Sequence, residues 1–310
     1  MGMSLRVEVL SLDGDTIRFL LRECDLAFAN GLRRIMIAEV PCMTIDDIFF
    51  FDNSSVMPDE VLAHRVGLVP LTTDLDSYVL PERCQCGSDL GCSLCRVVLT
   101  LDAEAEGETR TVYTGDIVSE DPGVVPMSPD IPLVKLAPGQ AVKFEAYARL
   151  GVGKMHAKWQ PASTCIYQHL ADIEIDEERC TLCGRCIEAC PRGVLAVEDE
   201  KLKVVDLYAC TLCGSCAEAC PVEPPTIVQR FKDETFLFTI ESNGFLPPER
   251  IVSQAAKVLV EKLDELSDKI KRGETDEEIE EFKVAEEVGR RLYSVGAGEY
   301  EDEDKEEEQE

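Results

Sequence analysis

The sequence has 310 residues, of which 45% are hydrophobic, and its 61 acidic and 31 basic side chains give a formal net charge of −30. A chain longer than the ~100–200 residues of a usual domain is expected to form two or three structural units, and its negative charge disfavours direct binding to DNA or RNA. Because no apolar run approaches the ~20 residues of a membrane span and the N-terminus lacks the pattern of a signal peptide, we expect a cytoplasmic protein without a membrane segment.

The first elements along the chain are predicted to be a β-hairpin and a helix. Apolar and polar residues alternate on both sides of Asp13-Gly14, which indicates two strands joined by a tight turn. Asp25 is a suitable N-cap for a helix over residues 26–39. The following stretch, residues 43–171, is predicted to be an irregular unit of short strands and loops, with a short helix over 59–66.

Four cysteines within this irregular unit have the spacing of metal ligands. They read C-x-C and then C-x2-C, and two neighbouring glycines would allow the loop to fold round a tetrahedral ion. Structural zinc is the first interpretation, because four thiolates leave no open position for catalysis, and a reduced loop without metal is the alternative. The four residues are Cys84, Cys86, Cys92 and Cys95.

The most specific motif is a cysteine pattern that occurs twice between residues 172 and 227. Each copy reads C-x2-C-x2-C-x3-C-P, and the tetrapeptides TLCG and EACP recur at matching places. In two-cluster ferredoxins, the first three thiolates of such a run bind one [4Fe–4S] cluster and the fourth binds the other cluster. The first copy contains Cys180, Cys183, Cys186 and Cys190, and the second contains Cys210, Cys213, Cys216 and Cys220.

Crossed ligation of this kind predicts two [4Fe–4S] clusters in a ferredoxin-like module. Zinc-binding CxxC knuckles are the rival interpretation, but zinc sites rarely use two such runs that each end in Cys-Pro. The first cluster would be bound by Cys180, Cys183, Cys186 and Cys220, and the second by Cys210, Cys213, Cys216 and Cys190.

A long amphipathic helix is predicted over residues 248–271. Its apolar residues, among them Leu259, Leu263 and Leu266, recur at steps of three or four and form a narrow stripe. Such a stripe either packs on the protein's own sheet or binds a partner subunit.

The remaining C-terminal residues, 273–310, form an acidic extension. A further helix is expected over 276–292, and the strongly acidic run beyond about residue 298 is expected to be disordered. The whole sequence contains no P-loop, dinucleotide-binding GxGxxG, nucleophile elbow or catalytic acid cluster, so no catalytic site is expected on this chain.

Three stretches in combination resemble one protein family. They are NGLRRIM at residues 30–36 followed by Val40-Pro41, LAHRVGLVPL at 62–71 and GKMHAKWQP at 153–161. Together they resemble the D-type subunit of archaeal DNA-directed RNA polymerase, the counterpart of the bacterial α amino-terminal region. The resemblance extends to about residue 270, and some members of this family carry a ferredoxin-like insertion at the same place.

The resemblance implies an α+β fold with an α-like dimerisation domain and an inserted second domain. The dimerisation domain would be discontinuous and built from residues 1–42 and 228–272. The inserted domain would comprise residues 43–171 and carry the ferredoxin-like module at 172–227. Eukaryotic relatives have structural zinc at a position similar to that of the four-cysteine loop.

The resemblance also implies partners. The chain would pair with the smaller α-like subunit L, and this pair would nucleate assembly with the small subunits N and P and the large catalytic subunits. Arg33 and Arg34 would contact a large subunit, with two solvated helix-surface charges as the alternative. The candidate residues of the subunit interface are Arg33, Arg34, Leu259, Leu263 and Leu266.

The predicted function is therefore that of a non-catalytic assembly platform of a DNA-directed RNA polymerase, the nucleotidyltransferase of transcription, whose active site lies on other chains. The clusters would stabilise a module with a small core and could make the protein redox-responsive. The alternative function is that of an electron-transfer iron–sulfur subunit of an anaerobic oxidoreductase, which is the usual role of ferredoxin modules.

Overall fold

The computed structural model describes residues 5–88 and 91–272. Contacts between residues divide the chain into two units, residues 1–260 and 261–310, and the described part of the second unit is the end of one helix. The helix predicted over 276–292 and the disordered tail predicted beyond it lie outside the described residues. Within the described part of the chain, no helix is both long enough and apolar enough to span a membrane.

The N-terminal elements are those that the sequence predicted. Strands β1 (Arg6–Asp13) and β2 (Thr16–Arg22) pair antiparallel as a hairpin. Helix α1 (Leu26–Ala38) follows, and the Asp25 side chain accepts a hydrogen bond from the N–H of Phe28 in its first turn. This cap satisfies one of the backbone donors that a helix leaves unpaired at its start.

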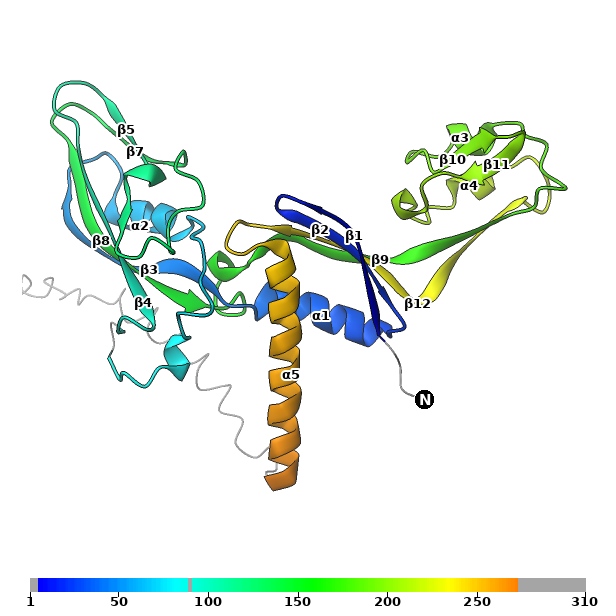
Figure 1. The fold of residues 1–310 in the computed structure, drawn as a ribbon. Helices are drawn as coiled ribbons and strands as arrows, with labels where there is room; N and C mark the ends of the chain where they lie inside the picture. The colour runs from blue at the N-terminus through cyan, green and yellow to red at the C-terminus, as the bar shows by residue number, and fades with distance from the viewer. Residues whose placement is uncertain (1–4, 89–90, 273–310) are drawn as a thin grey trace, which may run out of the picture. The chain divides into compact units, whose positions relative to one another are not determined.

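The hairpin belongs to a four-stranded antiparallel sheet with the order β1-β2-β12-β9 (Figure 1). Strands β9 (Ala162–Ile175) and β12 (Ile227–Ser242) come from much later in the chain. Because β12 pairs with β2 on one side and with β9 on the other, the sheet joins three distant stretches of sequence.

The core of this first sheet lies between its strands, α1 and the start of α5 (Pro248–Arg272). The rings of Phe19 and Phe238 stack with their centroids 5.1 Å apart. Ile251 and Ala255 of α5 are fully buried in the same core. Burial of these apolar side chains is the main force that holds the distant stretches together.

A second sheet is built from strands within residues 42–151. Its strand order is β3-β8-β4-β6, all neighbours are antiparallel, and one apolar core covers it. The prediction of short strands here is wrong for β3 and β8, which have 12 and 11 residues. The strands are β3 (Cys42–Asn53), β8 (Ala141–Gly151), β4 (Arg96–Glu104) and β6 (Val118–Ser119).

Shorter elements complete this part of the chain. The predicted short helix is present, and a two-stranded sheet and three 3₁₀ turns lie around the second sheet or after it. They are α2 (Asp59–Gly67), β5 (Arg110–Tyr113), β7 (Pro132–Leu136), η1 (Pro81–Arg83), η2 (Thr114–Asp116) and η3 (Ala157–Trp159).

Strands β9 and β12 continue as a pair beyond the first sheet and lead into the cysteine-rich module. Their register shifts where residues 232–235 bulge opposite Leu170, and pairing then resumes between Phe231 and Ala171. The domain boundary predicted after residue 171 therefore falls inside β9 and not in a linker. The sequence cannot show such a boundary, because apolar and polar residues alternate along the strand in the same way before and after it.

The module itself has a repeated plan. In each half, a cysteine loop leads to a short helix and then to a strand, and β10 and β11 pair antiparallel. Small apolar clusters lie beneath the loops. The elements are α3 (Arg185–Glu188), β10 (Leu195–Glu198), β11 (Lys201–Val204), η4 (Leu207–Ala209) and α4 (Ser215–Glu218).

Candidate metal centres

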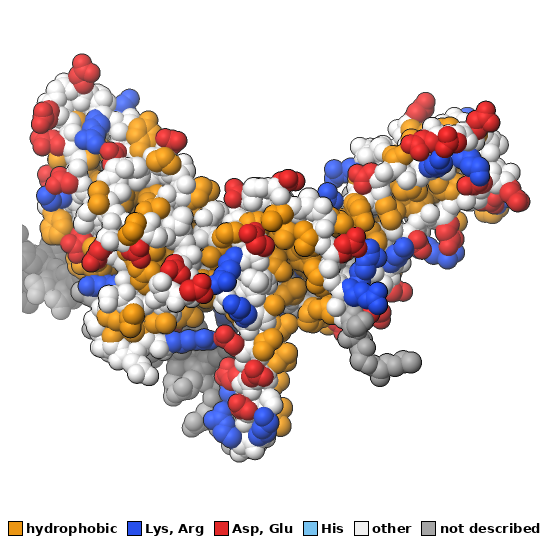
Figure 2. Space-filling view, in the orientation of Figure 1, with side chains coloured by type: hydrophobic (Ala, Val, Ile, Leu, Met, Phe, Trp, Pro, Cys, Tyr) orange, Lys and Arg blue, Asp and Glu red, His pale blue; other side chains and the backbone are white. Residues whose placement is uncertain are grey.

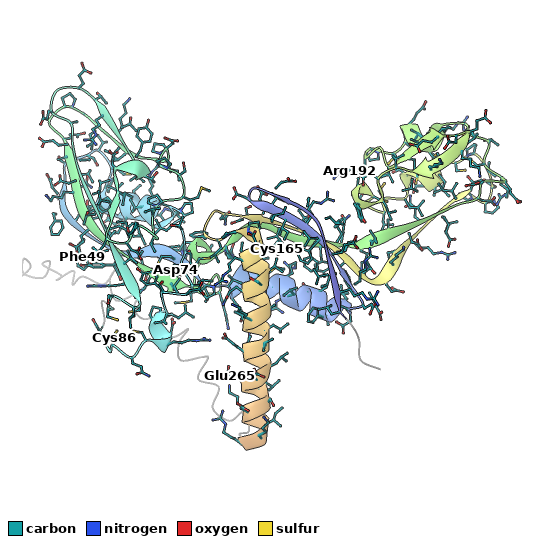
Figure 3. All side chains as sticks on the ribbon, viewed as in Figure 1. Phe49, Asp74, Cys86, Cys165, Arg192 and Glu265 are labelled. Carbon is teal, nitrogen blue, oxygen red and sulfur yellow. The ribbon has the colours of Figure 1, made fainter. Side chains whose placement is uncertain are left out.

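The four-cysteine loop brings its predicted ligands together. Cys84 directly follows η1 and Cys95 directly precedes β4, so both ends of the loop are anchored by regular structure (Figure 3). Gly91 has a φ of +82°, and a Cβ atom there would lie 3.0 Å from the Cys95 Sγ. Glycine is therefore required at this position both by the backbone and by the approach of the sulfur.

The four sulfurs have the separations of a tetrahedral site. All four lie within 4.8 Å of one another. The Sγ distances are 3.7 Å for Cys84 to Cys92, 3.9 Å for Cys86 to Cys95 and 3.9 Å for Cys92 to Cys95. Four thiolates that bind one zinc ion at ~2.3 Å would be separated by about 3.8 Å. The cysteine cluster could therefore hold one metal ion.

The acidity of these thiols differs. The N–H of Leu94, 3.5 Å from the Cys92 Sγ, lowers the pKa of Cys92 to about 7. Burial raises the pKa of Cys95 to about 12. Binding of an ion would therefore release protons, most of all from Cys95, because metal ligands must be thiolates.

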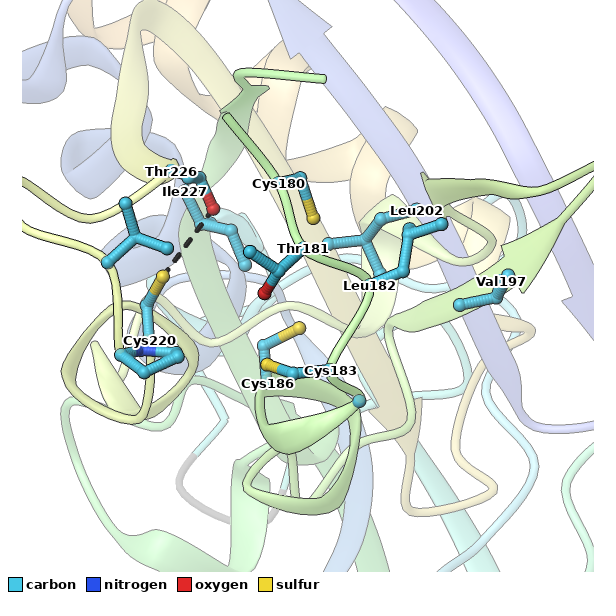
Figure 4. Close-up of a pocket in the computed structure, with 13 residues that line it drawn as sticks. Cys180, Thr181, Leu182, Cys183, Cys186, Val197, Leu202, Cys220, Thr226 and Ile227 are labelled. Carbon is cyan, nitrogen blue, oxygen red and sulfur yellow. Dashed lines mark hydrogen bonds between the residues drawn. The ribbon is translucent and has the colours of Figure 1, made fainter. Parts of the chain in front are cut away.

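Two further groups of four cysteines line two hollows in the repeated module. We call the first group site I, and the hollow that it lines is partly open to solvent (Figure 4). Three of its sulfurs come from the loop before α3 and its start, while the fourth comes from the end of the second run. The cysteines of site I are Cys180, Cys183, Cys186 and Cys220.

The second group, site II, is built in the same way from the other copy of the motif. Its hollow is lined by three cysteines of the second run and by the last cysteine of the first run. Each site thus combines cysteines from both runs, in the grouping that the ferredoxin pattern predicts. The cysteines of site II are Cys210, Cys213, Cys216 and Cys190.

The repeated TLCG sequence gives both loops the same backbone. Leu182 and Leu212 both have a φ of 55°, a left-handed conformation that is uncommon for leucine. Gly184 and Gly214 follow with φ values of 76° and 86°, and a short helix starts after each. Two consecutive turns of this kind bend the chain tightly, so three cysteines per loop face one hollow.

The sulfurs of the two hollows are spaced differently from those of the four-cysteine loop. Among the described residues, only that loop has its sulfurs close enough for a single ion. The nature of the ligand at sites I and II, iron–sulfur cluster or zinc, stays a prediction.

Hydroxyl groups lie next to one exposed or half-buried sulfur of each site. The Thr226 hydroxyl, 3.5 Å from the Cys220 Sγ, lowers the pKa of Cys220 (Figure 4). The Ser215 hydroxyl similarly lowers the pKa of Cys213. Both hydrogen bonds favour the thiolate form that metal ligation requires.

The other three cysteines are structural. Burial raises the pKa of Cys24 and of Cys165 to about 11, and it also raises that of Cys42. All three lie in the core of the first sheet. They are protonated at neutral pH and act there as small apolar side chains.

The predicted interface residues differ in exposure. The guanidinium of half-buried Arg33 donates two hydrogen bonds, of 3.2 and 3.0 Å, to the side-chain oxygen of Asn30, whereas Arg34 is exposed. Arg33 is therefore held in place by its own helix, and neither the predicted contact nor the alternative of two solvated charges is decided. Arg34 has the accessibility that a contact with another chain requires.

The leucine stripe of α5 changes from half-buried to exposed along the helix. Leu259 packs partly against the first core, while Leu263 and Leu266 are 56% and 54% exposed. Val260 and Ile270 are also exposed, and Figure 2 shows apolar side chains along one side of α5. The stripe therefore packs on the protein's own core at its start and is exposed further along the helix.

Two contacts involve residues that the sequence did not single out. Lys158 donates to the Asp46 carboxylate, which also pairs with Arg149, and this joins the GKMHAKWQP stretch to the second sheet. Gln229 of β12 donates to the Cys216 Sγ of site II. The only sequence signal for Gln229 is that the two halves of the module continue differently after their Cys-Pro pairs.

Comparison with known proteins identifies the family. Residues 18–263, from β2 into α5, match the RNA polymerase Rpb3/Rpb11 dimerisation domain. DNA-directed RNA polymerase subunit Rpo3 of Methanothermobacter thermautotrophicus is 44% identical over 251 residues, which are 80% of this chain and 92% of the relative. The chain belongs to the Rpo3 family of RNA polymerase subunits.

Other Rpo3 proteins match over nearly their whole length. The Rpo3 of Archaeoglobus fulgidus is 40% identical over 265 residues, 86% of this chain and 97% of the relative. That of Methanosphaera stadtmanae is 38% identical over 264 residues, 84% of this chain and 97% of the relative. Membership of the Rpo3 family confirms the prediction of a non-catalytic polymerase subunit and does not favour the oxidoreductase alternative.

Proposed function

We propose that this Rpo3-family chain is the assembly platform of its RNA polymerase. It pairs with the smaller α-like subunit L, and the pair recruits the small subunits N and P and the large catalytic subunits. The observation that carries this proposal is the match to the Rpb3/Rpb11 dimerisation domain over residues 18–263, which include strands of both sheets and most of α5.

The exposed part of the α5 stripe supports pairing through this helix. Leu263, Leu266 and Ile270 follow one another at helical spacing and are each more than half exposed. A row of apolar side chains flanked by charged residues is typical of a helix that packs on a partner. We further propose that Arg34 contacts a large subunit, because an exposed guanidinium can bind a carboxylate with two hydrogen bonds.

Co-expression with a candidate L subunit tests the pairing. The two chains should copurify as a stable heterodimer, and Leu263→Glu or Leu266→Glu should weaken it at least tenfold, because burial of an unpaired charge is costly. Lys257→Glu changes charge on the opposite face of the helix and should leave pairing intact. A heterodimer that tolerates both leucine variants would remove α5 from the interface.

We also propose that sites I and II each hold a [4Fe–4S] cluster. The repeated ferredoxin spacing, the two hollows and the convergence of four sulfurs on each hollow support this proposal. The bound clusters would supply the ligation energy that stabilises a module with small apolar cores, and a one-electron redox couple at each site. The cysteines hold the clusters, and the Thr226 and Ser215 hydroxyls favour thiolates at their sites.

Metal analysis of anaerobically purified protein tests the clusters. Two occupied sites should give about eight irons per chain and the electron paramagnetic resonance signals of reduced [4Fe–4S] clusters. Cluster loss on exposure to oxygen would unfold the module, and we propose that it also weakens assembly with the other subunits. Normal polymerase assembly by the Cys183→Ser variant would overturn the link between clusters and assembly.

We propose, finally, that the four-cysteine loop holds structural zinc. Its sulfur separations are those of a tetrahedral thiolate site, and the four thiolates leave no open coordination position. About one zinc per chain, in addition to the iron, is the expected result of metal analysis.

A further inference from the structure

In each half of the repeat, the Cys-Pro pair is followed by a strand, β10 in the first half and β12 in the second. Corresponding residues of these two strands, which we call twins, line the two sites. Leu195 lines site II and Ile227 lines site I. Two residues further along each strand, Val197 lines site I and Gln229 lines site II. Val197 and Gln229 are therefore equivalent positions, of which one is apolar and the other carries a hydrogen-bond donor.

The orientation of the Gln229 amide is fixed by its second contact. Its Oε1 accepts a hydrogen bond of 3.1 Å from the backbone N–H of Gly214. Because a backbone N–H can only donate, the amide oxygen must face Gly214 and the NH₂ group must face the other way. The NH₂ group lies against the Sγ of Cys216, to which it donates.

No matching contact occurs among the described residues of site I. Cys186, the twin of Cys216, lines the same hollow as Val197, whose side chain cannot donate. Each site also has one hydroxyl next to a ligand sulfur, Thr226 at Cys220 and Ser215 at Cys213, so these contacts do not distinguish the two sites. Each site has an arginine nearby: Arg192 lines site II (Figure 3), and the charge of Arg179 helps to lower the pKa of Cys220 at site I.

We propose that Gln229 makes site II the more easily reduced of the two sites. This inference rests on the proposed [4Fe–4S] clusters. Uptake of one electron adds negative charge, part of which resides on the cysteine sulfurs, and a hydrogen bond to a sulfur stabilises that charge. No bond is made or broken, and the electron comes from an added reductant such as dithionite.

Burial acts in the opposite direction. Cys210 and Cys216 of site II are both buried, whereas at site I only Cys186 is. A less polar environment disfavours the more negative state of a cluster. The amide of Gln229, however, acts directly on a ligand sulfur.

A redox titration of the full chain, followed by electron paramagnetic resonance, tests the proposal. Gln229→Val gives site II the residue found at its twin position. The ratio of reduced to oxidised cluster at one site, measured at a fixed potential, should fall about tenfold. This corresponds to a decrease of ~59 mV in the reduction potential of that cluster for a one-electron couple. The cluster whose reduction potential shifts should be the one with the higher potential in the unchanged protein.

The reciprocal variant and a control on the same strand complete the experiment. Val197→Gln supplies a donor to site I and should raise the potential of the other cluster. Val228→Gln adds the same side chain on the opposite face of β12 and should move neither potential. If Gln229→Val fails to fold, Val197→Gln still tests the effect.

The possible failures can be told apart by iron content. About eight irons per chain with unchanged potentials in both Gln229→Val and Val197→Gln would overturn the role of Gln229 alone. A shift of the lower-potential site in Gln229→Val would also overturn it. Absence of iron from the anaerobically purified chain would overturn the cluster proposal and, with it, this inference.

Discussion

The indole ring of Trp159 lies directly against the backbone of Gly151. A Cβ atom at residue 151 would lie only 2.3 Å from a carbon of the ring. Trp159 is buried in the core of the first sheet, whereas Gly151 ends strand β8 of the second sheet. This contact therefore joins the two sheets at the point where the chain passes from one to the other.

Gly151→Ala should destabilise the protein by about 2 kcal/mol, because an added methyl group forces the ring out of a packed core. Trp159 is the single tryptophan of the chain, so its fluorescence during urea unfolding reports on this contact. Gly107→Ala is the control, since a Cβ atom there meets nothing within 4 Å. Equal stability of the two variants would show that the ring adapts without cost.

The ion pairs of Asp46 predict a dependence of stability on pH. Burial alone would raise the pKa of Asp46, but hydrogen bonds and charge interactions with Lys158 and Arg149 lower it below the usual value. A carboxyl whose pKa is lower in the folded state contributes stability above its unfolded pKa of about 4 and loses it as the pH falls through the folded value.

Asp46→Asn should therefore lower the free energy of unfolding at pH 7 by about 3 kcal/mol, because Lys158 would lose its partner within a largely buried site. The difference from the unchanged protein should shrink below about pH 4, where Asp46 is protonated in the unfolded chain. Asp52→Asn, at an exposed position of the same strand, is the control. A difference that persists unchanged to low pH would rule out the ion pairs as its cause.

The four-cysteine loop should lose its metal when one ligand is removed. Cys86→Ser is expected to reduce zinc content from about one per chain to near zero, because three thiolates bind the ion far more weakly than four. Ser88→Ala, in the same loop, should leave the zinc content unchanged. Zinc that stays at full content in Cys86→Ser would mean that the loop is not its site.

Paired serine variants test which cysteines share a site. If ligation is crossed, Cys180→Ser combined with Cys220→Ser removes ligands from site I alone and should leave about half of the iron. Cys180→Ser combined with Cys190→Ser removes one ligand from each site and should eliminate most of it. The reverse outcome would show that each run of cysteines binds its own cluster.

Local features of the fold could be read from the sequence. The hairpin around Asp13-Gly14, the helix capped by Asp25 and the long helix after Pro247 are all present as predicted. Each depends on interactions between residues that are close in the chain, namely a turn, a cap or a helical periodicity. The division into domains stays a prediction, although its boundary after residue 171 lies within β9.

The sequence by itself determined the family, the local elements and the repeated cysteine spacing, because each of these is recorded in residues a few positions apart. Only the tertiary structure decided that β12 lies between β2 and β9, that Lys158 meets Asp46, and that Gln229 reaches a sulfur of one site while Val197 lines the other. These encounters join residues distant in sequence, and they follow from strand register and core packing, which no local pattern specifies.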